Sequence, residues 1–224
     1  LSFDEVSTLF HEFGHALHGM LSDCSYEGLS GTNVARDFVE LPSQFMENWA
    51  FEKEWLDTWA IHHKPGVKIP SELIERIRDA ATFNEGYACS RQLGFALLDM
   101  AWHTITEPFT GDIKEFEVRA MDRTEMFPVD STLNLSCSFT HLFSGGYAAG
   151  YYGYKWAEVL DADAFRHFSE SGLFNPEVAD SFRKNILEKG ESERPMDLYI
   201  KFRGRKPSMD AFLERSGLKK SAKS

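Results

Sequence analysis

Apolar side chains follow a helical period at the start of the chain. Between Ser2 and Met20 they recur at intervals of three and four residues, which places them on one face of a helix. The recurring residues are Val6, Leu9, Phe10, Phe13, Ala16, Leu17 and Met20. Ser2 and Glu5 have the spacing of a capping box, which satisfies two backbone amides at a helix start. The pattern predicts an amphipathic helix over residues 2–20.

Helical patterns continue along most of the chain. A turn-rich stretch at residues 27–33 precedes a second long helix, expected over residues 36–60 with a local irregularity at Pro42. Few segments alternate as strands do, so the predicted fold class is mainly α. Further helices are expected over residues 71–83, 84–105, 112–126, 149–168, 176–188 and 208–216, and an irregular segment over residues 127–150.

Length and composition bound the size of the packed core. The 224 residues, 42% of them hydrophobic, are enough for one large domain or two small ones. We expect a single region over residues 1–218, with a disordered polar tail at residues 219–224. Acidic residues outnumber basic ones by 35 to 24, which argues against nucleic acid or an anionic membrane as a partner. No apolar run approaches the roughly 18 residues that cross a bilayer.

Cysteine content and the first residue bear on the setting of the chain. Cys24, Cys89 and Cys137 are odd in number and lack metal-ligand spacing, which is typical of thiols in a reducing compartment. We therefore expect a cytoplasmic protein. The chain begins with Leu1, close to its strongest motif, so we expect a piece of a longer protein.

A metal-binding motif lies on the first predicted helix. His11-Glu12-Phe13-Gly14-His15 has the form H-E-x-x-H, and residues four apart share a helix face, so both imidazoles can reach one ion. Zinc with three protein ligands keeps an open position for water. Glu12 would act as the general base on that water. The motif also occurs by chance, but three ionisable groups on an otherwise apolar helix are costly without a partner.

A third ligand is required, and several acidic residues qualify. Glu40 follows His15 by 25 residues on the second predicted helix, from which a carboxylate would complete a two-histidine, one-glutamate site for one zinc ion per chain. Asp37, Glu47 and His18 are competing candidates, and each could instead orient the histidines.

Three stretches of the chain carry a further signal, namely Leu9 to His18, Ser30 to Gln44 and Phe139 to Tyr154. Together they resemble the thimet oligopeptidase, oligopeptidase A and peptidyl-dipeptidase group of zinc peptidases. The resemblance covers nearly the whole chain, and members of that group are much longer. It therefore implies that this chain is the C-terminal catalytic portion of a helical zincin-type enzyme, without the opposite wall of the substrate cleft.

The resemblance implies roles for particular residues. It makes Glu40 the third zinc ligand, and it implies that one histidine and three tyrosines of the Gly-rich segment face the substrate. These residues are His141, Tyr147, Tyr151 and Tyr154. A tyrosine hydroxyl or an imidazolium can donate to the oxyanion formed at a peptide carbonyl. Glycines such as Gly146 let the loop approach peptide backbone, and Arg36 is a candidate partner of a substrate carboxylate or of Asp37.

The expected function is zinc-dependent hydrolysis of short peptides, with release of C-terminal dipeptides. An oligopeptidase A-like endopeptidase is the close alternative. A zinc-binding but inactive half-enzyme is a third reading, and Glu12 distinguishes it because a structural site has no use for that carboxylate. A nucleotide site at Gly145-Gly146 lacks the lysine and hydroxyl of a phosphate loop. If the chain exists alone, apolar surface built to face the missing portion would favour a homo-oligomer.

Overall fold

The structure is a computed structural model that describes residues 1–64, 66–128 and 132–219. Every regular element in these ranges is helical, apart from one antiparallel bridge between Ile61 and Lys68. The mainly α class is confirmed. The chain divides into two compact units, Leu1–Phe83 with Ala157–Ser224 and Asn84–Trp156. The single region expected over residues 1–218 stays a prediction, and residues 220–224 of the expected tail lie outside the described residues.

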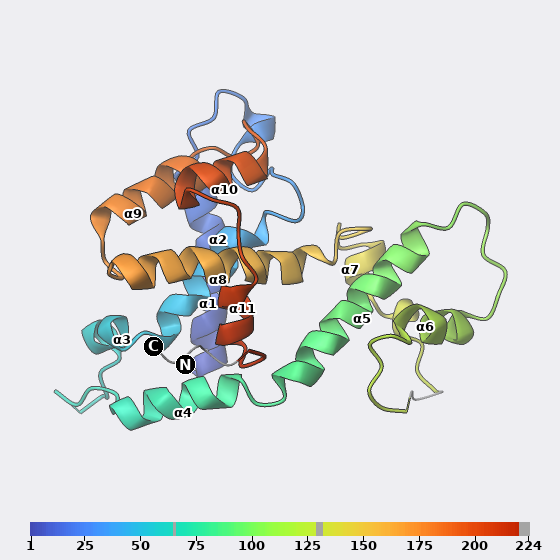
Figure 1. Cartoon of the computed structure of the whole chain (residues 1–224), viewed down its shortest axis with the longest axis horizontal. Helices are drawn as coiled ribbons and strands as arrows, with labels where there is room; N and C mark the ends of the chain where they lie inside the picture. Colours follow the sequence, from blue (N-terminus) through green and yellow to red (C-terminus); the bar gives the residue numbers. More distant parts are fainter. Residues whose placement is uncertain (65, 129–131, 220–224) are drawn as a thin grey trace. The chain divides into compact units, whose positions relative to one another are not determined.

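The first unit begins with the predicted amphipathic helix, α1 (Phe3–Met20). Ser2 and Glu5 form the expected capping box, and α1 packs against α2 (Glu40–Glu47). Figure 1 labels these helices and shows α8 (Gly153–Ser171), which crosses the boundary between the units in sequence. The other helices of this unit are η1 (Glu27–Leu29), η2 (Asn48–Phe51), α3 (Lys53–Trp59), α4 (Ser71–Ala81), α9 (Pro176–Phe182), the π-helical turn η4 (Arg183–Leu187), α10 (Pro195–Arg203) and α11 (Asp210–Arg215).

The prediction of one helix over residues 36–60 was wrong. That segment contains α2, the short η2 and α3, and the backbone is extended at Glu52 between the last two. Pro42 lies in the first turn of α2, where a missing backbone N–H costs nothing. It marks the start of a helix, so α2 begins at Glu40 and not at Arg36.

The C-terminal part contains a helix that the periodicity did not predict. α10 begins with Pro195 in its first turn and ends at Gly204, which has a positive φ of 78°. Proline at the start and glycine past the end are common helix boundary signals. The helix expected over residues 176–188 is present as α9 and the turn η4, because the backbone changes to π-type hydrogen bonding at Arg183.

Aromatic side chains fill the core of the first unit. The ring of Phe45 from α2 stacks on Phe182 at 4.4 Å between centroids, and it also contacts Phe165 and Phe168 of α8. Large aromatic rings dominate the energy of such a core because each buries a large apolar area. The packing fixes α2, and with it Glu40, relative to α8 and α9 within this unit.

The second unit is built around one long helix, α5 (Glu85–His103). α5 packs against α6 (Ile113–Met121), where Trp102 lies 4.0 Å from Phe116 between ring centroids. Asn84 precedes α5 in the left-handed conformation, and its side chain does not cap the helix. The segment expected to be irregular contains η3 (Leu135–Cys137) and the short helix α7 (Thr140–Phe143), and its residues 129–131 lie outside the described residues.

Candidate functional site

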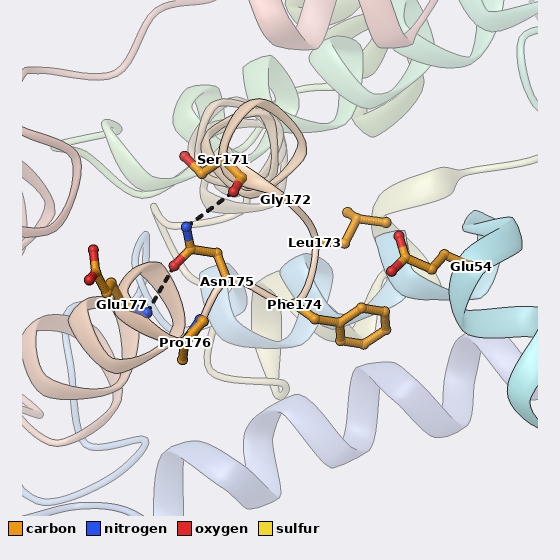
Figure 2. A pocket seen from close by; sticks show the side chains of 8 residues that line it. All are labelled: Glu54, Ser171, Gly172, Leu173, Phe174, Asn175, Pro176 and Glu177. Carbon is orange, nitrogen blue, oxygen red and sulfur yellow. Dashed lines mark hydrogen bonds between the residues drawn. The ribbon is translucent and has the colours of Figure 1, made fainter.

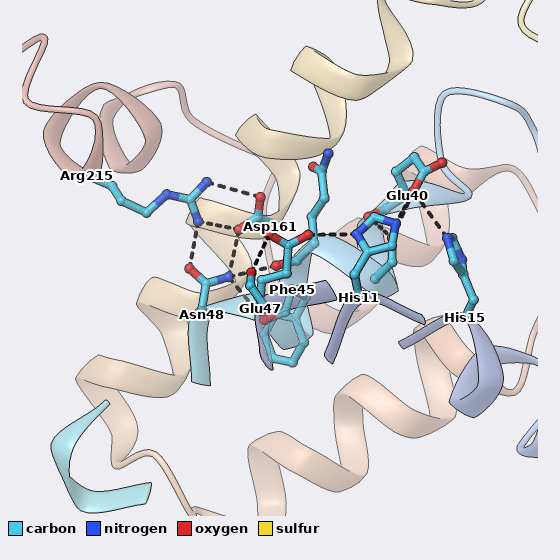
Figure 3. A network of polar contacts seen from close by, with 11 residues as sticks. His11, His15, Glu40, Phe45, Glu47, Asn48, Asp161 and Arg215 are labelled. Carbon is cyan, nitrogen blue, oxygen red and sulfur yellow. Dashed lines mark hydrogen bonds and ion pairs between the residues drawn. The ribbon is translucent and has the colours of Figure 1, made fainter. Parts of the chain in front are cut away.

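The two histidines of the motif lie on neighbouring turns of α1. His11 and His15 are both half-buried, and their rings are 5.0 Å apart between centroids. The Nε2 atom of each lies 3.3 Å from the same oxygen, Oε2 of Glu40. Figure 3 shows the Glu40 carboxylate between the two rings. The sequence spacing therefore brings both imidazoles to one point.

Glu40 reaches this point because α1 and α2 approach closely at Gly14. A Cβ atom at residue 14 would lie 2.5 Å from the carbonyl oxygen of Pro42 and 2.5 Å from the Cα of Ser43. Only glycine avoids these clashes. Ser43 also donates from its hydroxyl to Glu40 Oε2 at 2.9 Å, which holds the buried carboxylate in place. Sequence analysis did not identify Gly14 or Ser43, although both lie inside the recognised motifs.

The three ligand atoms fit a metal ion. Zinc binds nitrogen and oxygen at about 2.0–2.1 Å, so two ligands of a tetrahedral ion lie about 3.4 Å apart. The observed separations of 3.3 Å match that value. Among the described residues, the group that could hold a metal consists of His11, His15 and Glu40. Glu40 is 4% exposed, so the site also excludes much of the water on that side.

Glu47 contacts the other nitrogen of His11. The Nδ1–H of His11 donates to Oε1 of Glu47 at 2.7 Å, which leaves Nε2 available as a ligand. Hydrogen bonds with Glu40, and then with Glu47, raise the pKa of His11 to about 10. Two carboxylates thus favour positive charge at this imidazole. The sequence left open whether Glu47 is a ligand. In the structure it lies where it orients the proposed ligand His11.

A second network fixes the residue after Glu47. Asn48 donates to Oδ1 of Asp161 at 2.9 Å and accepts from Arg215 at 2.7 Å (Figure 3). Arg215 also pairs with both carboxylate oxygens of Asp161, which is buried. A bidentate arginine–carboxylate pair is directional, so it holds α8 and α11 to the end of α2. This network supports the backbone from which Glu47 reaches His11.

The remaining ligand candidates of the sequence lie apart from this group. His18 is fully buried, and within the described residues neither of its ring nitrogens has a hydrogen-bond partner. Burial, and then the nearby His15, lowers the pKa of His18 to about 4, so it is neutral at physiological pH. Asp37 is half-buried and is not a member of the group that could hold a metal. Glu12 is exposed on α1, next to His11.

The histidine and tyrosines of the Gly-rich segment come together in the second unit. The His141 ring lies 6.0 Å from Tyr147, 6.0 Å from Tyr151 and 6.2 Å from Tyr154 between centroids. Tyr147 stacks on Tyr154 at 4.8 Å, and Tyr154 lies 5.3 Å from Tyr151. We call these four residues the ring cluster. The structure thus brings these four residues together, and their roles toward a substrate stay a prediction.

The tyrosines of the ring cluster have different surroundings. Tyr151 is 9% exposed and belongs to the core with Ala96 and Leu142. Its hydroxyl donates to Oε1 of Gln92 at 3.0 Å, and burial raises its pKa. Tyr154 packs against that core and is half-buried. No sequence pattern pointed to Gln92, because it is 59 residues from Tyr151.

Gly146 and Arg36, two of the residues expected to bind substrate, are both exposed. Gly146 has a positive φ of 79°, a conformation that glycine adopts without strain. A Cβ atom on the neighbouring Gly145 would lie 2.9 Å from the Cα of His141, so this loop lies close to α7. Arg36 is exposed in the first unit, shortly before α2.

The first unit also has a surface pocket. It is formed by the loop between α8 and α9 with one residue of α3, and Phe174 and Asn175 face it (Figure 2). Asn175 caps α9 through hydrogen bonds to the amides of Glu177 and Val178, so its polar group has a structural role. None of the predicted site residues lines this pocket.

Comparison with known proteins identifies the family of the chain. A model of peptidase family M3 matches residues 1–218. Oligopeptidase A of Escherichia coli (strain K12) is 47% identical over 218 residues, which cover 96% of this chain and 32% of that protein. Dipeptidyl carboxypeptidase of the same organism is 43% identical over 220 residues, covering 97% and 32%. Thimet-like oligopeptidase of Dictyostelium discoideum is 37% identical over 220 residues, covering 97% and 32%. The chain thus spans about a third of the length of these relatives.

Proposed function

The chain belongs to peptidase family M3, and on that premise we propose that it is the catalytic region of a zinc metallopeptidase that hydrolyses short peptides. The observation that carries the proposal is the convergence of three ligand atoms. The Nε2 atoms of His11 and His15 and the Oε2 atom of Glu40 are spaced as the ligands of one tetrahedral ion.

Zinc is the metal that this donor set favours. Two neutral imidazoles and one carboxylate, with a further position left open, form the ligand set of hydrolytic zinc sites. In our proposal His11, His15 and Glu40 hold one zinc ion per chain. A bound zinc ion supplies Lewis-acid activation of water and of the scissile carbonyl.

The chain's own residues carry the proton and charge steps of the proposed reaction. Glu12 lies one residue from His11 and is exposed, so its carboxylate can take a proton from the attacking water and pass it to the leaving amine. Tyr154 donates to the oxyanion, with Tyr151 or His141 as further donors. Tyr147 and Gly146 contact the substrate backbone, and Arg36 pairs with a substrate carboxylate. The four rings of the ring cluster lie together in the second unit, and in our proposal they act on one substrate.

We propose release of C-terminal dipeptides as the mode of cleavage. One relative, 43% identical, is named dipeptidyl carboxypeptidase, and another, 47% identical, is named oligopeptidase A. Endopeptidase action on oligopeptides is therefore the alternative. A zinc-binding half-enzyme without activity is the second alternative, because the chain spans about a third of these relatives.

The test is digestion of a short peptide by the full chain, followed by mass spectrometry. The peptide is supplied with a free C-terminal carboxylate and in an amidated form, each with zinc and with a chelator. Chelator-sensitive release of dipeptides from the free form alone supports the proposal. Internal cleavage of both forms supports the endopeptidase, and one bound zinc per chain without cleavage supports the inactive half-enzyme.

Glu12→Gln provides the matched control for this digestion. The substitution keeps the size of the side chain and removes the base, so zinc content should stay at one per chain while cleavage is lost. Unchanged cleavage by Glu12→Gln would remove Glu12 from the mechanism.

Partners and location are part of the proposal as well. No described helix has the length and apolar character needed to cross a membrane. Cys24, Cys89 and Cys137 are thiols, which supports a reducing, cytoplasmic setting.

Short peptides are the proposed partners, and the excess of acidic residues opposes nucleic acid. The exposed Leu9 and Phe13 of α1 support self-association, which light scattering of the purified chain would measure.

A further inference from the structure

A buried carboxylate in the second unit has no part in the chemistry described so far. Asp99 of α5 is 0% exposed, although isolated buried charges are costly. Its Oδ1 accepts from the backbone N–H of Ala149 at 2.9 Å, and its Oδ2 accepts from the backbone N–H of Tyr151 at 2.9 Å. His103, one turn further along α5, places Nδ1 2.7 Å from Oδ1. The carboxylate is therefore paired on both oxygens.

The backbone that Asp99 holds is strained. Ala149 has a φ of 53°, in the left-handed region where a Cβ atom is unfavourable. Residues in such conformations persist only where their surroundings hold them. The two amides that converge on Asp99 lie on either side of Gly150, so one side chain fixes both ends of this turn.

The same turn carries the tyrosines of the ring cluster. The amide of Tyr151 is one of the two donors, and its ring lies 5.3 Å from that of Tyr154. The amide of Gly150 donates to the carbonyl of Tyr147 at 2.9 Å, so a shift of the turn would move Tyr147 too. Asp99 is thus linked to three of the four rings through its hydrogen bonds to this turn and the short stretch of backbone that carries those rings.

We propose that Asp99 is a positioning residue of this enzyme, which fixes the 147–151 turn so that the ring cluster meets the transition state. The proposal rests on the proposed function, because it assigns the rings to the reaction. Asp99 itself touches no substrate in this scheme. It acts through the amides of Ala149 and Tyr151.

Asp99→Asn tests the contact with little change of shape. The amide side chain keeps one acceptor oxygen and turns an NH₂ donor toward a backbone N–H, so one of the two hydrogen bonds is lost. Amide hydrogen exchange at Ala149 and Tyr151, measured in the full chain, reports the turn directly. We expect exchange to rise by at least about tenfold at the amide that loses its acceptor, the effect of losing one such hydrogen bond.

Kinetics of the same variant report the positioning role. A misplaced donor weakens binding of the transition state more than of the ground state, so kcat should fall by about tenfold with KM within about twofold. Combined with Tyr154→Phe, Asp99→Asn should cost less than about threefold further, because the donor that it positions is already absent.

Glu117→Gln is the matched control. Glu117 is also a buried carboxylate of the second unit, 1% exposed, and its Oε1 accepts from the amide of Ser136 at 2.6 Å. This variant should lower the unfolding temperature and leave exchange at Ala149 and Tyr151 unchanged, with kcat within about twofold of the parent. It separates a general loss of stability from a loss of position.

Several results would overturn the proposal. Unchanged exchange in Asp99→Asn would show that Asp99 does not hold the turn. An equal loss of kcat with and without Tyr154→Phe would show that it does not act through that ring. If Asp99→Asn does not fold, adding Ala149→Gly relieves the strain at that residue, and the same measurements apply. An inactive parent chain would contradict the proposed function, and with it the positioning role, while the exchange data would still decide whether Asp99 holds the turn.

Discussion

Gly14 of α1 and Ser43 of α2 lie in direct backbone contact, so close that a Cβ atom at residue 14 would be 2.5 Å from the Cα of Ser43. Gly14 lies between His11 and His15 in the sequence of α1. Ser43 stands one turn after Glu40 and donates to its carboxylate. The contact therefore sets the distance between the histidines and the glutamate.

Gly14→Ala should separate the two helices and weaken metal binding. The added methyl group meets backbone atoms of Pro42 and Ser43, which cannot move aside as a flexible side chain could. We expect a loss of at least about 2 kcal/mol in the free energy of unfolding, typical of overpacking in a tight core. Zinc affinity, measured by competition with a chromophoric chelator, should fall by tenfold or more.

Gly19→Ala is the control for the Gly14 substitution. It makes the same change on the same helix, and a Cβ atom there meets nothing within 4 Å. Since alanine favours a helix over glycine, stability should be unchanged or slightly higher. Equal zinc affinity of the parent and both variants would contradict the role of the close contact.

The sequence predicted the part of the site that depends on local spacing. His11 and His15 share a face because the helical period fixes it, and the capping box at Ser2 fixes where that helix begins. The role of Glu47 was left open, because only the 2.7 Å distance to the far nitrogen of His11 distinguishes a ligand from an orienting group. Periodicity cannot supply a distance between side chains of two helices.

Long-range pairs and helix ends were beyond the periodic pattern. Asp99 and Tyr151 are 52 residues apart in sequence, so nothing local indicates their hydrogen bond. Pro42 was interpreted as an irregularity within a helix, whereas proline is equally suited to a first turn. The break before α3, at Glu52, was missed as well. α10 was missed because its helical stretch is short, although Pro195 and Gly204 mark both ends.

Glu47→Gln should weaken zinc binding without removing a ligand. The amide still accepts from the Nδ1–H of His11 but carries no charge, so the imidazole is held less firmly and is a poorer ligand. We expect zinc affinity to fall by about tenfold to a hundredfold, as when other groups that orient a ligand are changed. Glu54→Gln makes the same change at an exposed residue of α3 and should leave affinity unchanged. A Glu47→Gln affinity equal to that of Glu54→Gln would contradict the role of Glu47.

Tyr154→Phe should lower kcat by about a hundredfold, the usual effect of removing one donor to an oxyanion. Tyr151→Phe should lower kcat by less than about tenfold, because the hydroxyl of Tyr151 already donates to Gln92 within the core. It should instead lower the unfolding temperature, since Gln92 loses its partner. Steady-state kinetics on one peptide compare the two. A loss below threefold for Tyr154→Phe would remove Tyr154 from the mechanism, and a larger loss for Tyr151→Phe would exchange their roles.

The buried His18 should make the metal-free chain less stable in mild acid. Burial, and then His15, lowers the pKa of His18 to about 4, below the value of about 6.5 in an unfolded chain. Between these two values the unfolded state binds a proton at this residue and the folded state does not. The stability contribution of neutral His18 is therefore complete above pH 6.5 and is lost as the pH falls toward 4.

Urea unfolding with a chelator at pH 7 and pH 5 measures this effect, in the parent chain and in His18→Gln. Glutamine does not titrate, so the variant lacks this source of acid sensitivity, although it is expected to be less stable at both pH values because the buried site is repacked. The parent should lose more unfolding free energy between pH 7 and pH 5 than the variant does. Carboxylates and the other histidines titrate alike in both chains and cancel in the comparison. Equal losses would show that His18 takes up a proton in the folded chain as readily as in the unfolded one, against the effect expected from its burial.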